Sequence, residues 1–344
     1  MRSTPDLQSA TPQGETKAPR QSWWLRLFLR LGVLPFLLAA AVAIFALQSP
    51  QFLTADNLFN LLRQSVYLIL VSLGQMLALA TGGFDLSVGT VIALTSVVSA
   101  TVMTSLGPES TAIVSIVLGC GAGLMAGLLL GLCNGLGVAV AGVSPFIMTL
   151  GVQSIGLGIA LALTGGVPVS GLPPMFSETL GFGVVLGLPM PVWVVIAIFV
   201  LMMVLMNRTA TGIHLLAVGG NSKAANLSGI SIRRTYLLAY VLCALLASVA
   251  GLLLTARVDS GEANLGASIA LESIAACVIA GVSLRGGVAR VENVVLGAIF
   301  IGLVQNGMNL TNVGSYMQMV VLGVLLIVAV VADQVRHRLM RADQ

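Results

Sequence analysis

Charged residues are scarce in this sequence. Asp, Glu, Lys and Arg make up only 8% of the 344 residues, whereas 57% are hydrophobic and the mean hydropathy is +1.03. A soluble globular domain carries about 25% charged residues. The composition therefore excludes a water-soluble enzyme, and the repeated apolar runs of about 20 residues indicate helices that cross a bilayer. We expect an all-α polytopic transmembrane helical bundle.

Histidine and cysteine are also few, with two and four residues respectively. The cysteines, Cys120, Cys133, Cys243 and Cys277, stand singly in hydrophobic runs. This spacing argues against a metal site or a disulfide framework and favours buried thiols. The sequence also has no GK[ST] phosphate-binding loop, so any nucleotide must be bound by another chain. We expect no metal, no cofactor and no catalytic residue.

The apolar runs predict about ten spans, each near the length that a bilayer requires. They cover residues 31–48, 61–80, 87–106, 112–134, 145–164, 191–206, 235–255, 268–283, 292–310 and 315–332. An even number of spans places both termini on the same side of the membrane. With cytoplasmic termini, fourteen of the sixteen basic residues lie inside and only Arg63 and Arg257 lie outside. The positive-inside rule therefore favours cytoplasmic termini, and this placement of the basic residues gives no reason to expect nucleic-acid binding.

The chain ends differ from the apolar middle. Residues 1–21 are rich in Pro and Thr and predict a disordered cytoplasmic tail. No small-residue cleavage site follows, so we do not expect a signal peptide. One transmembrane domain is expected over residues 22–335, with a cytoplasmic loop at 207–234 and a second cytoplasmic tail at 336–344. The residues expected to anchor the first span at the interface are Trp23, Trp24, Arg26, Phe28 and Arg30.

Only two ionisable residues, Asp85 and Glu272, are clear candidates for positions within the spans. Intramembrane charge is costly, so each is a functional suspect. Asp85 follows the Gly82-Gly83 pair that interrupts the second apolar run, where it can cap the next helix or line a cavity; both interpretations stay open. The lack of a chain of acids argues against proton-coupled or sodium-coupled transport.

Uncharged polar side chains recur on several spans. Amide pairs share faces at helical spacing, as Gln305 and Asn309 do, and Phe84 and Phe146 stand near the breaks. Such groups suit a neutral polyhydroxylated solute, because each can donate or accept hydrogen bonds and aromatic rings can stack on sugars. The alternative is that they only bind helices together or fill space. The candidate substrate-path residues are Gln64, Gln75, Phe84, Asp85, Phe146, Thr149, Gln153, Gln305, Asn306 and Asn309.

Glycine has a regular pattern in the fourth span. Five residues, spaced by four, are glycine: Gly119, Gly123, Gly127, Gly131 and Gly135. A glycine face lets a neighbouring helix approach closely, so a packing role is favoured over a substrate groove.

The longest internal cytoplasmic segment, residues 207–234, predicts a docking element. Asn221 or Ser222 can cap a short helix that Gly229 ends. An ordinary connection would be short or irregular, so a helix there favours contact with a partner.

Four motifs resemble those of the ribose-type ABC sugar importer permeases. Residues 82–89, GGFDLSVG, resemble the family's GGIDLSVG, and residues 144–151, SPFIMTLG, resemble PPFIxTLG. Residues 219–230, GGNSKAANLSGI, are similar to GGNxxAAxLSGI, and residues 280–287, AGVSLRGG, to GGxSLxGG. Residues 270–276, ALESIAA, depart from the family's ELDAIAA, because the first acid is missing and Glu272 replaces Asp.

The resemblance implies the membrane-spanning permease subunit of an ATP-binding-cassette importer in the bacterial inner membrane. Its cargo would be a neutral monosaccharide or similar polyol. Its partners would be cytoplasmic ABC ATPase subunits, a periplasmic or lipid-anchored sugar-binding protein and a second permease chain, identical or paralogous. The alternative function is a stand-alone sugar facilitator or ion-coupled carrier. An intramembrane enzyme is disfavoured because His214 and His337 are far from Asp85 in the sequence. The residues implied to couple to the ATPase are Gly220, Asn221, Lys223, Ala224, Ala225, Leu227, Ser228 and Gly229.

Overall fold

The structure is a computed structural model that describes residues 34–106 and 111–342. The predicted tail at 1–21 and the predicted anchor from Trp23 to Arg30 lie outside the described residues. At the other end of the chain, residues 336–342 of the predicted tail are helical and continue the last helix.

The described chain is almost entirely helical. The longer helices are α2 (Leu34–Gln48), α3 (Ala55–Ala80), α4 (Val88–Ser105), α5 (Ala112–Ala139), α6 (Pro145–Thr164), α8 (Met190–Arg208), α9 (Ala210–Gly220), α11 (Ile232–Val258), α12 (Ile269–Ile279), α13 (Val291–Leu310) and α14 (Ser315–Ala342). The short elements are α7 (Pro174–Phe176), the π-helix η1 (Ser177–Gly181), α10 (Ser222–Leu227) and a two-stranded antiparallel hairpin of β1 (Val184–Val185) and β2 (Leu188–Pro189).

Seven of these helices are long and apolar enough to cross a membrane: α3, α4, α5, α6, α8, α11 and α13. This confirms an all-α polytopic membrane protein. The three remaining predicted runs correspond to the shorter apolar helices α2, α12 and the apolar part of α14. The predicted run at 268–283 is helical only over the eleven residues of α12. Such a helix is roughly 16 Å long, about half the hydrocarbon thickness of a bilayer.

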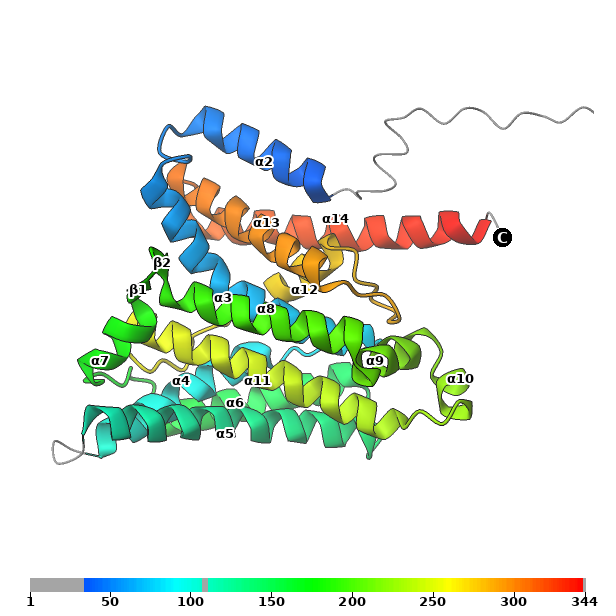
Figure 1. The fold of residues 1–344 in the computed structure, drawn as a ribbon, viewed down its shortest axis with the longest axis horizontal. Coiled ribbons are helices and arrows are strands. Elements are labelled where there is room, and N and C mark those ends of the chain that lie inside the picture. Colours follow the sequence, from blue (N-terminus) through cyan, green and yellow to red (C-terminus); the bar gives the residue numbers. More distant parts are fainter. Residues whose placement is uncertain (1–33, 107–110, 343–344) are drawn as a thin grey trace, which may run out of the picture.

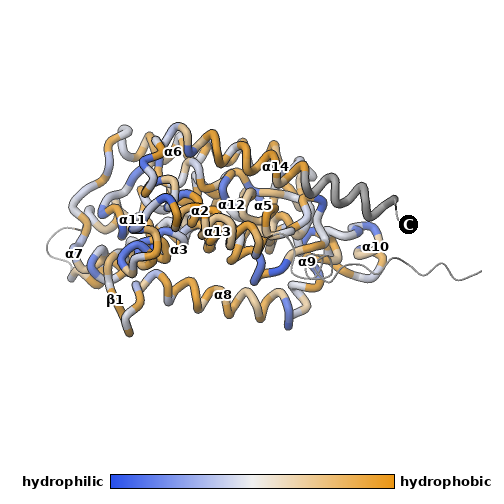
Figure 2. Tube along the Cα trace, turned by 90° about the horizontal axis from the view of Figure 1, so that it is seen from above, coloured by the Kyte–Doolittle hydropathy of each residue, from blue (hydrophilic) through white to orange (hydrophobic). Residues whose placement is uncertain are grey.

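The long helices run approximately along one axis of the molecule (Figure 1). The hairpin, α7 and η1 lie at one end, and α9 and α10 lie at the other (Figure 1). The beginning of α2 and the end of α14 are at the same end as α9 and α10 (Figure 1). The span α3 is the most deeply buried, whereas only 22% of the residues in the apolar windows of α6 and α8 are buried. The hydropathy colouring shows this apolar surface along α6, α8 and α14 (Figure 2).

The glycine face of α5 packs against two helices, as the sequence predicts. All five glycines of the face are buried. A Cβ added to Gly123 would lie 3.0 Å from the Thr95 carbonyl oxygen of α4, and one at Gly131 would lie 2.6 Å from Ala244 Cβ of α11. The face is therefore a packing surface that brings α4 and α11 close to α5.

Candidate functional site

Asp85 lies in the break between α3 and α4 and is fully buried. Its Oδ1 accepts hydrogen bonds from the Ser87 N–H at 2.8 Å and the Ser87 hydroxyl at 2.6 Å. The side-chain amide of Asn134, on α5, donates to Asp85 Oδ1 at 3.4 Å and to Oδ2 at 3.3 Å. The hydrogen bonds to Ser87 thus stabilise the turn that leads into α4, and those from Asn134 join this turn to α5.

Gln75 supports the same break from the preceding turn of α3. Its side chain is fully buried. The amide donates to the Asp85 carbonyl oxygen at 3.0 Å and accepts from the Asp85 N–H at 3.1 Å. This contact gives hydrogen-bond partners to both the N–H and the carbonyl oxygen of Asp85. The buried backbone at this irregular position is therefore satisfied without a helix.

Asn306 forms a second buried amide contact, far from Asp85 in the sequence. Its side chain and that of Asn57 each donate to the other at 2.9 Å, which joins α13 to the first turn of α3. Asn57 also donates to the Phe52 carbonyl oxygen at 2.8 Å. This reciprocal pair is a helix-to-helix contact within one chain.

The two candidates on α6 lie against α4. The Thr149 hydroxyl is buried and donates to the Pro145 carbonyl oxygen one turn earlier at 2.9 Å. The carbonyl oxygen of Gln153 accepts from the Thr90 hydroxyl at 3.1 Å. Gln153 itself is half-buried.

The remaining candidates are at or near the surface of the chain. Gln64 and Asn309 are exposed, and Gln305 is half-buried. Asn309 accepts a hydrogen bond from Gln318 of α14 at 2.7 Å. The rings of Phe84 and Phe146 meet edge to face with centroids 6.1 Å apart.

The structure therefore divides the candidates into a buried group and a surface group. Gln75, Asp85, Thr149 and Asn306 are buried and hydrogen-bonded within the chain. Sequence reasoning missed the partner residues Asn57 and Asn134, although Asn134 is the one amide among the apolar and glycine residues of its run and could have been singled out.

The segment after α8 forms two short helices joined at Asn221. The Asn221 N–H donates to the Ala217 carbonyl oxygen at 3.0 Å and completes α9, while its side chain accepts from the Ala224 N–H at 3.0 Å and caps α10. Ser228 ends α10 by donating its N–H to the Ala224 carbonyl oxygen, and Gly229 follows with a φ of +83°. The predicted short helix, its cap and its glycine end are thus confirmed.

The exposed side of α10 ends in an apolar residue. Leu227, the last residue of the helix, is 89% exposed, and Lys223, one turn earlier, is also exposed. Ala224 is exposed beside them, whereas Ala225 is buried against the chain. Gly220, Ser228 and Gly229 are exposed as well.

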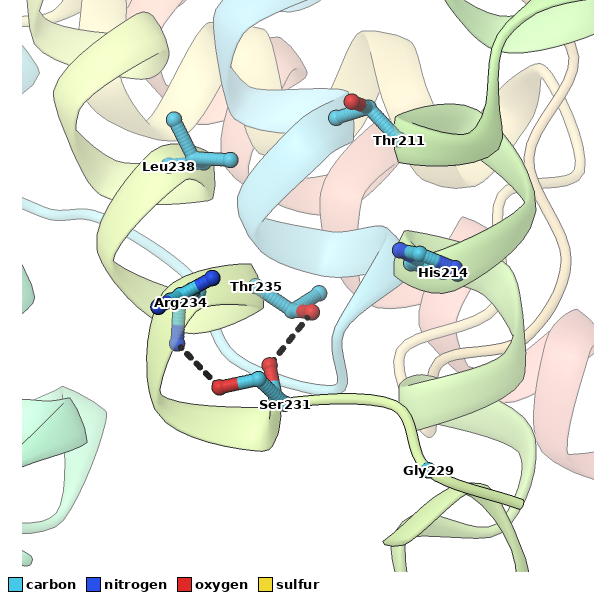
Figure 3. Close-up of a pocket in the computed structure, with 7 residues that line it drawn as sticks. All are labelled: Thr211, His214, Gly229, Ser231, Arg234, Thr235 and Leu238. Carbon is cyan, nitrogen blue, oxygen red and sulfur yellow. Dashed lines mark hydrogen bonds between the residues drawn. The ribbon is translucent and has the colours of Figure 1, made fainter.

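A cavity of about 260 Å³ separates α9 from the start of α11. Its walls are drawn in Figure 3: Thr211, His214, Gly229, Ser231, Arg234, Thr235 and Leu238. Ser231 caps α11 by accepting from the Arg234 N–H, and the Thr235 hydroxyl donates to the Ser231 carbonyl oxygen (Figure 3).

The chain matches a known family over residues 57–330, described as the branched-chain amino acid transport system / permease component. It is 37% identical over 302 residues to the ribose import permease protein RbsC of Escherichia coli K12, covering 86% of this chain and 91% of that protein. It is 38% identical over 303 residues to RbsC of Bacillus subtilis, covering 87% and 92%. It is 35% identical over 301 residues to the D-allose transport system permease protein AlsC of E. coli K12, covering 87% and 90%. No solved structure matches the chain.

Proposed function

The chain belongs to the family of branched-chain amino acid transport system permease components, and from this premise we propose its cargo, partners and topology. It is a multi-pass permease subunit of an ATP-binding-cassette importer in the plasma membrane, and ATP hydrolysis takes place on separate ATPase chains. We propose that it carries a neutral monosaccharide or a similar polyol inward.

The neutral character of the candidate path supports a sugar as cargo. Among the ten candidate path residues Asp85 alone is ionisable, and its carboxylate is enclosed by Ser87 and Asn134. The side chains left at the surface are amides and aromatic rings, which suit hydroxyl groups and sugar faces. The relatives named above are described as permeases for ribose and allose, and a further relative, from Azospirillum brasilense, as one for L-arabinose.

The shape of α10 supports its role as the docking element for the ATPase. It projects from the end of the bundle together with α9 (Figure 1). Leu227 is the side chain that would enter the partner, and Lys223 and Ala224 would border the contact. The substrate-binding protein would meet the opposite end, where the hairpin and η1 lie.

A second permease chain, identical or paralogous, would cover the exposed apolar surface of α6 and α14. These helices border the same side of the molecule when it is seen from above (Figure 2). Phe146 of α6 is 48% exposed, so the path would run along this side between the two chains. Membrane lipid would cover the other apolar faces.

The proposed topology has ten spans and cytoplasmic termini, with the permease domain over residues 22–335 and the coupling loop at 207–234. Three of the four shorter apolar helices, α2, α12 and the apolar part of α14, would complete ten spans with the seven long ones. The location of the beginning of α2 and the end of α14 at the same end as α10 supports an even number (Figure 1). Arg208, Arg233 and Arg234 flank the α9–α10 segment, as the positive-inside rule requires of a cytoplasmic loop.

The test of α10 as the docking element is a charge placed at its exposed last residue. Leu227→Glu in the reconstituted importer should abolish ATP-driven uptake of labelled ribose, arabinose or allose and weaken co-purification of the ATPase. Leu186→Glu is the matched control for co-purification of the ATPase, which it should leave unchanged, because Leu186 is 86% exposed in the hairpin at the opposite end. Undiminished uptake by Leu227→Glu would contradict the docking role. Competition by leucine but by no sugar would contradict the proposed cargo.

A further inference from the structure

Three glycine-containing segments, distant in the sequence, meet by backbone contact beside α9. Gly82 follows the end of α3, Gly219 and Gly220 end α9, and Gly286 and Gly287 lie in the turn between α12 and α13. The Gly287 N–H donates to the carbonyl oxygen of Ala80, the last residue of α3, at 3.0 Å. The ends of two spans and the helix next to α10 are thus held together at one point.

The contact leaves no room for a side chain at Gly219 of α9. A Cβ added to Gly219 would overlap the Ala80 carbonyl oxygen and would lie 2.6 Å from the Gly287 nitrogen. A Cβ at Gly286 would lie 2.7 Å from the Gly82 nitrogen and 2.8 Å from Gly219 Cα. Because backbone atoms meet backbone atoms, no flexible side chain can absorb a relative movement, and the segments must move together.

On the side of the ATPase, the movement of α10 is transmitted to α9 through Asn221. This residue completes α9 with its N–H and caps α10 with its side chain. The cavity lined by His214 and Arg234 separates α9 from α11 at the same level. The pair of short helices is therefore joined through Asn221, and α9 packs against the end of α3 as well as against α11.

On the side of the path, Ala80 is followed directly by the break that contains Asp85. Gln75 and Asn134 hold this break to α3 and α5. The edge-to-face pair of Phe84 and Phe146 begins in the same break and reaches α6. A displacement of the end of α3 would therefore change the position of Phe84 relative to α6.

We propose that Gly219 is a positioning residue for energy coupling: its contact with Ala80 and Gly287 joins α10 to the break between α3 and α4. ATPase closure then moves α10, α9, the end of α3 and the turn before α13 as one body. This inference rests on the proposed docking of the ATPase at α10.

The matched pair Gly219→Ala and Gly220→Ala tests the joint, because a Cβ at Gly220 meets only Gly287 Cα, at 3.9 Å. In proteoliposomes that contain the whole importer, Gly219→Ala should lower the sugar imported per ATP hydrolysed by about tenfold, within the range of typical coupling energies. Gly220→Ala should leave this ratio unchanged. An unchanged ratio in Gly219→Ala would overturn the joint. A wild-type importer that takes up no sugar with ATP would instead contradict the proposed function.

Distances between spin labels test the same joint without altering the glycines. Labels are placed in pairs at Asn226, an exposed residue of α10 outside the proposed contact, and at Arg285 and Val320, with Cys120 and Cys133 replaced by Ala and labelled permease diluted with unlabelled. Between the ATP-bound and nucleotide-free importer, the distance from Asn226 to Val320 of α14 should change, whereas the distance from Asn226 to Arg285 should stay constant. An equal change in both distances, or no change in either, would overturn the proposal.

Discussion

The side-chain amide of Asn134 lies within 3.4 Å of both carboxylate oxygens of Asp85 and donates to the Ser87 hydroxyl at 2.7 Å. This contact joins the irregular turn between α3 and α4 to α5. It gives Asp85 partners for its charge inside the protein, so the acid that the sequence marks as a functional suspect also has a structural role.

Asn134→Leu should destabilise the protein. The Asp85 carboxylate would lose the amide donor while staying buried, and a buried group left unsatisfied costs about 1–3 kcal/mol, more for a charge. The measurement is thermal unfolding of the purified protein in detergent. Cys133→Leu is the control, because the neighbouring Cys133 is exposed. An unfolding temperature equal to that of the control would show that Asn134 does not hold Asp85.

Gln75→Leu should have a much larger effect on stability than Gln64→Leu. The two glutamines are on one face of α3, but only Gln75 is buried, where it satisfies the backbone of Asp85. Its loss leaves two buried backbone groups without partners, each worth about 1–3 kcal/mol. Unfolding in detergent measures both variants. Equal stabilities would contradict the contact with Asp85.

The reciprocal amide pair of Asn57 and Asn306 should give strong coupling in a double-mutant cycle. Each single substitution to Leu leaves the other amide buried without its partner, whereas the double variant removes both polar groups. The coupling energy should lie between about 0.5 and 3 kcal/mol, the range for residues in contact. Additive effects of the two single substitutions on unfolding would contradict the pairing.

Substitution by alanine should change the stability of the protein differently at two glycines of α5. Gly131→Ala places a Cβ 2.6 Å from Ala244 Cβ, and such overpacking costs about 1–3 kcal/mol. A Cβ at Gly121 has no atom within 4 Å, so Gly121→Ala should gain up to about 1 kcal/mol of helix propensity. The unfolding temperature should fall for the first and be equal or higher for the second. An equal decrease in unfolding temperature for both variants would contradict the packing role of the glycine face.

Local patterns in the sequence predicted much of the fold. Hydrophobic runs predict the locations of the long helices, because the length of a span is set by the bilayer. Asn221 and Gly229 predict the limits of α10, because caps act on their own helix. The shortness of α12 was not predicted, because the apolar run continues past its last residue, Ile279.

The candidate site was less predictable because it depends on contacts across the sequence. Helical spacing puts Gln64 and Gln75 on one face, but burial increases along α3 as it enters the bundle, so the two differ in environment. The link between Asp85 and Asn134 spans 49 residues, and the contact of Gly219 with Ala80 joins segments with no shared pattern. Neither follows from periodicity.

Reconstitution of the purified chain into liposomes tests the central claim most directly. Labelled ribose, arabinose and allose are offered in turn, each with its binding protein, with and without the ATPase and ATP. Accumulation of one of these sugars only when the binding protein, the ATPase and ATP are all present is the predicted result. Accumulation or rapid equilibration of that sugar by the permease alone would contradict an importer driven from the cytoplasmic side and would establish a stand-alone carrier.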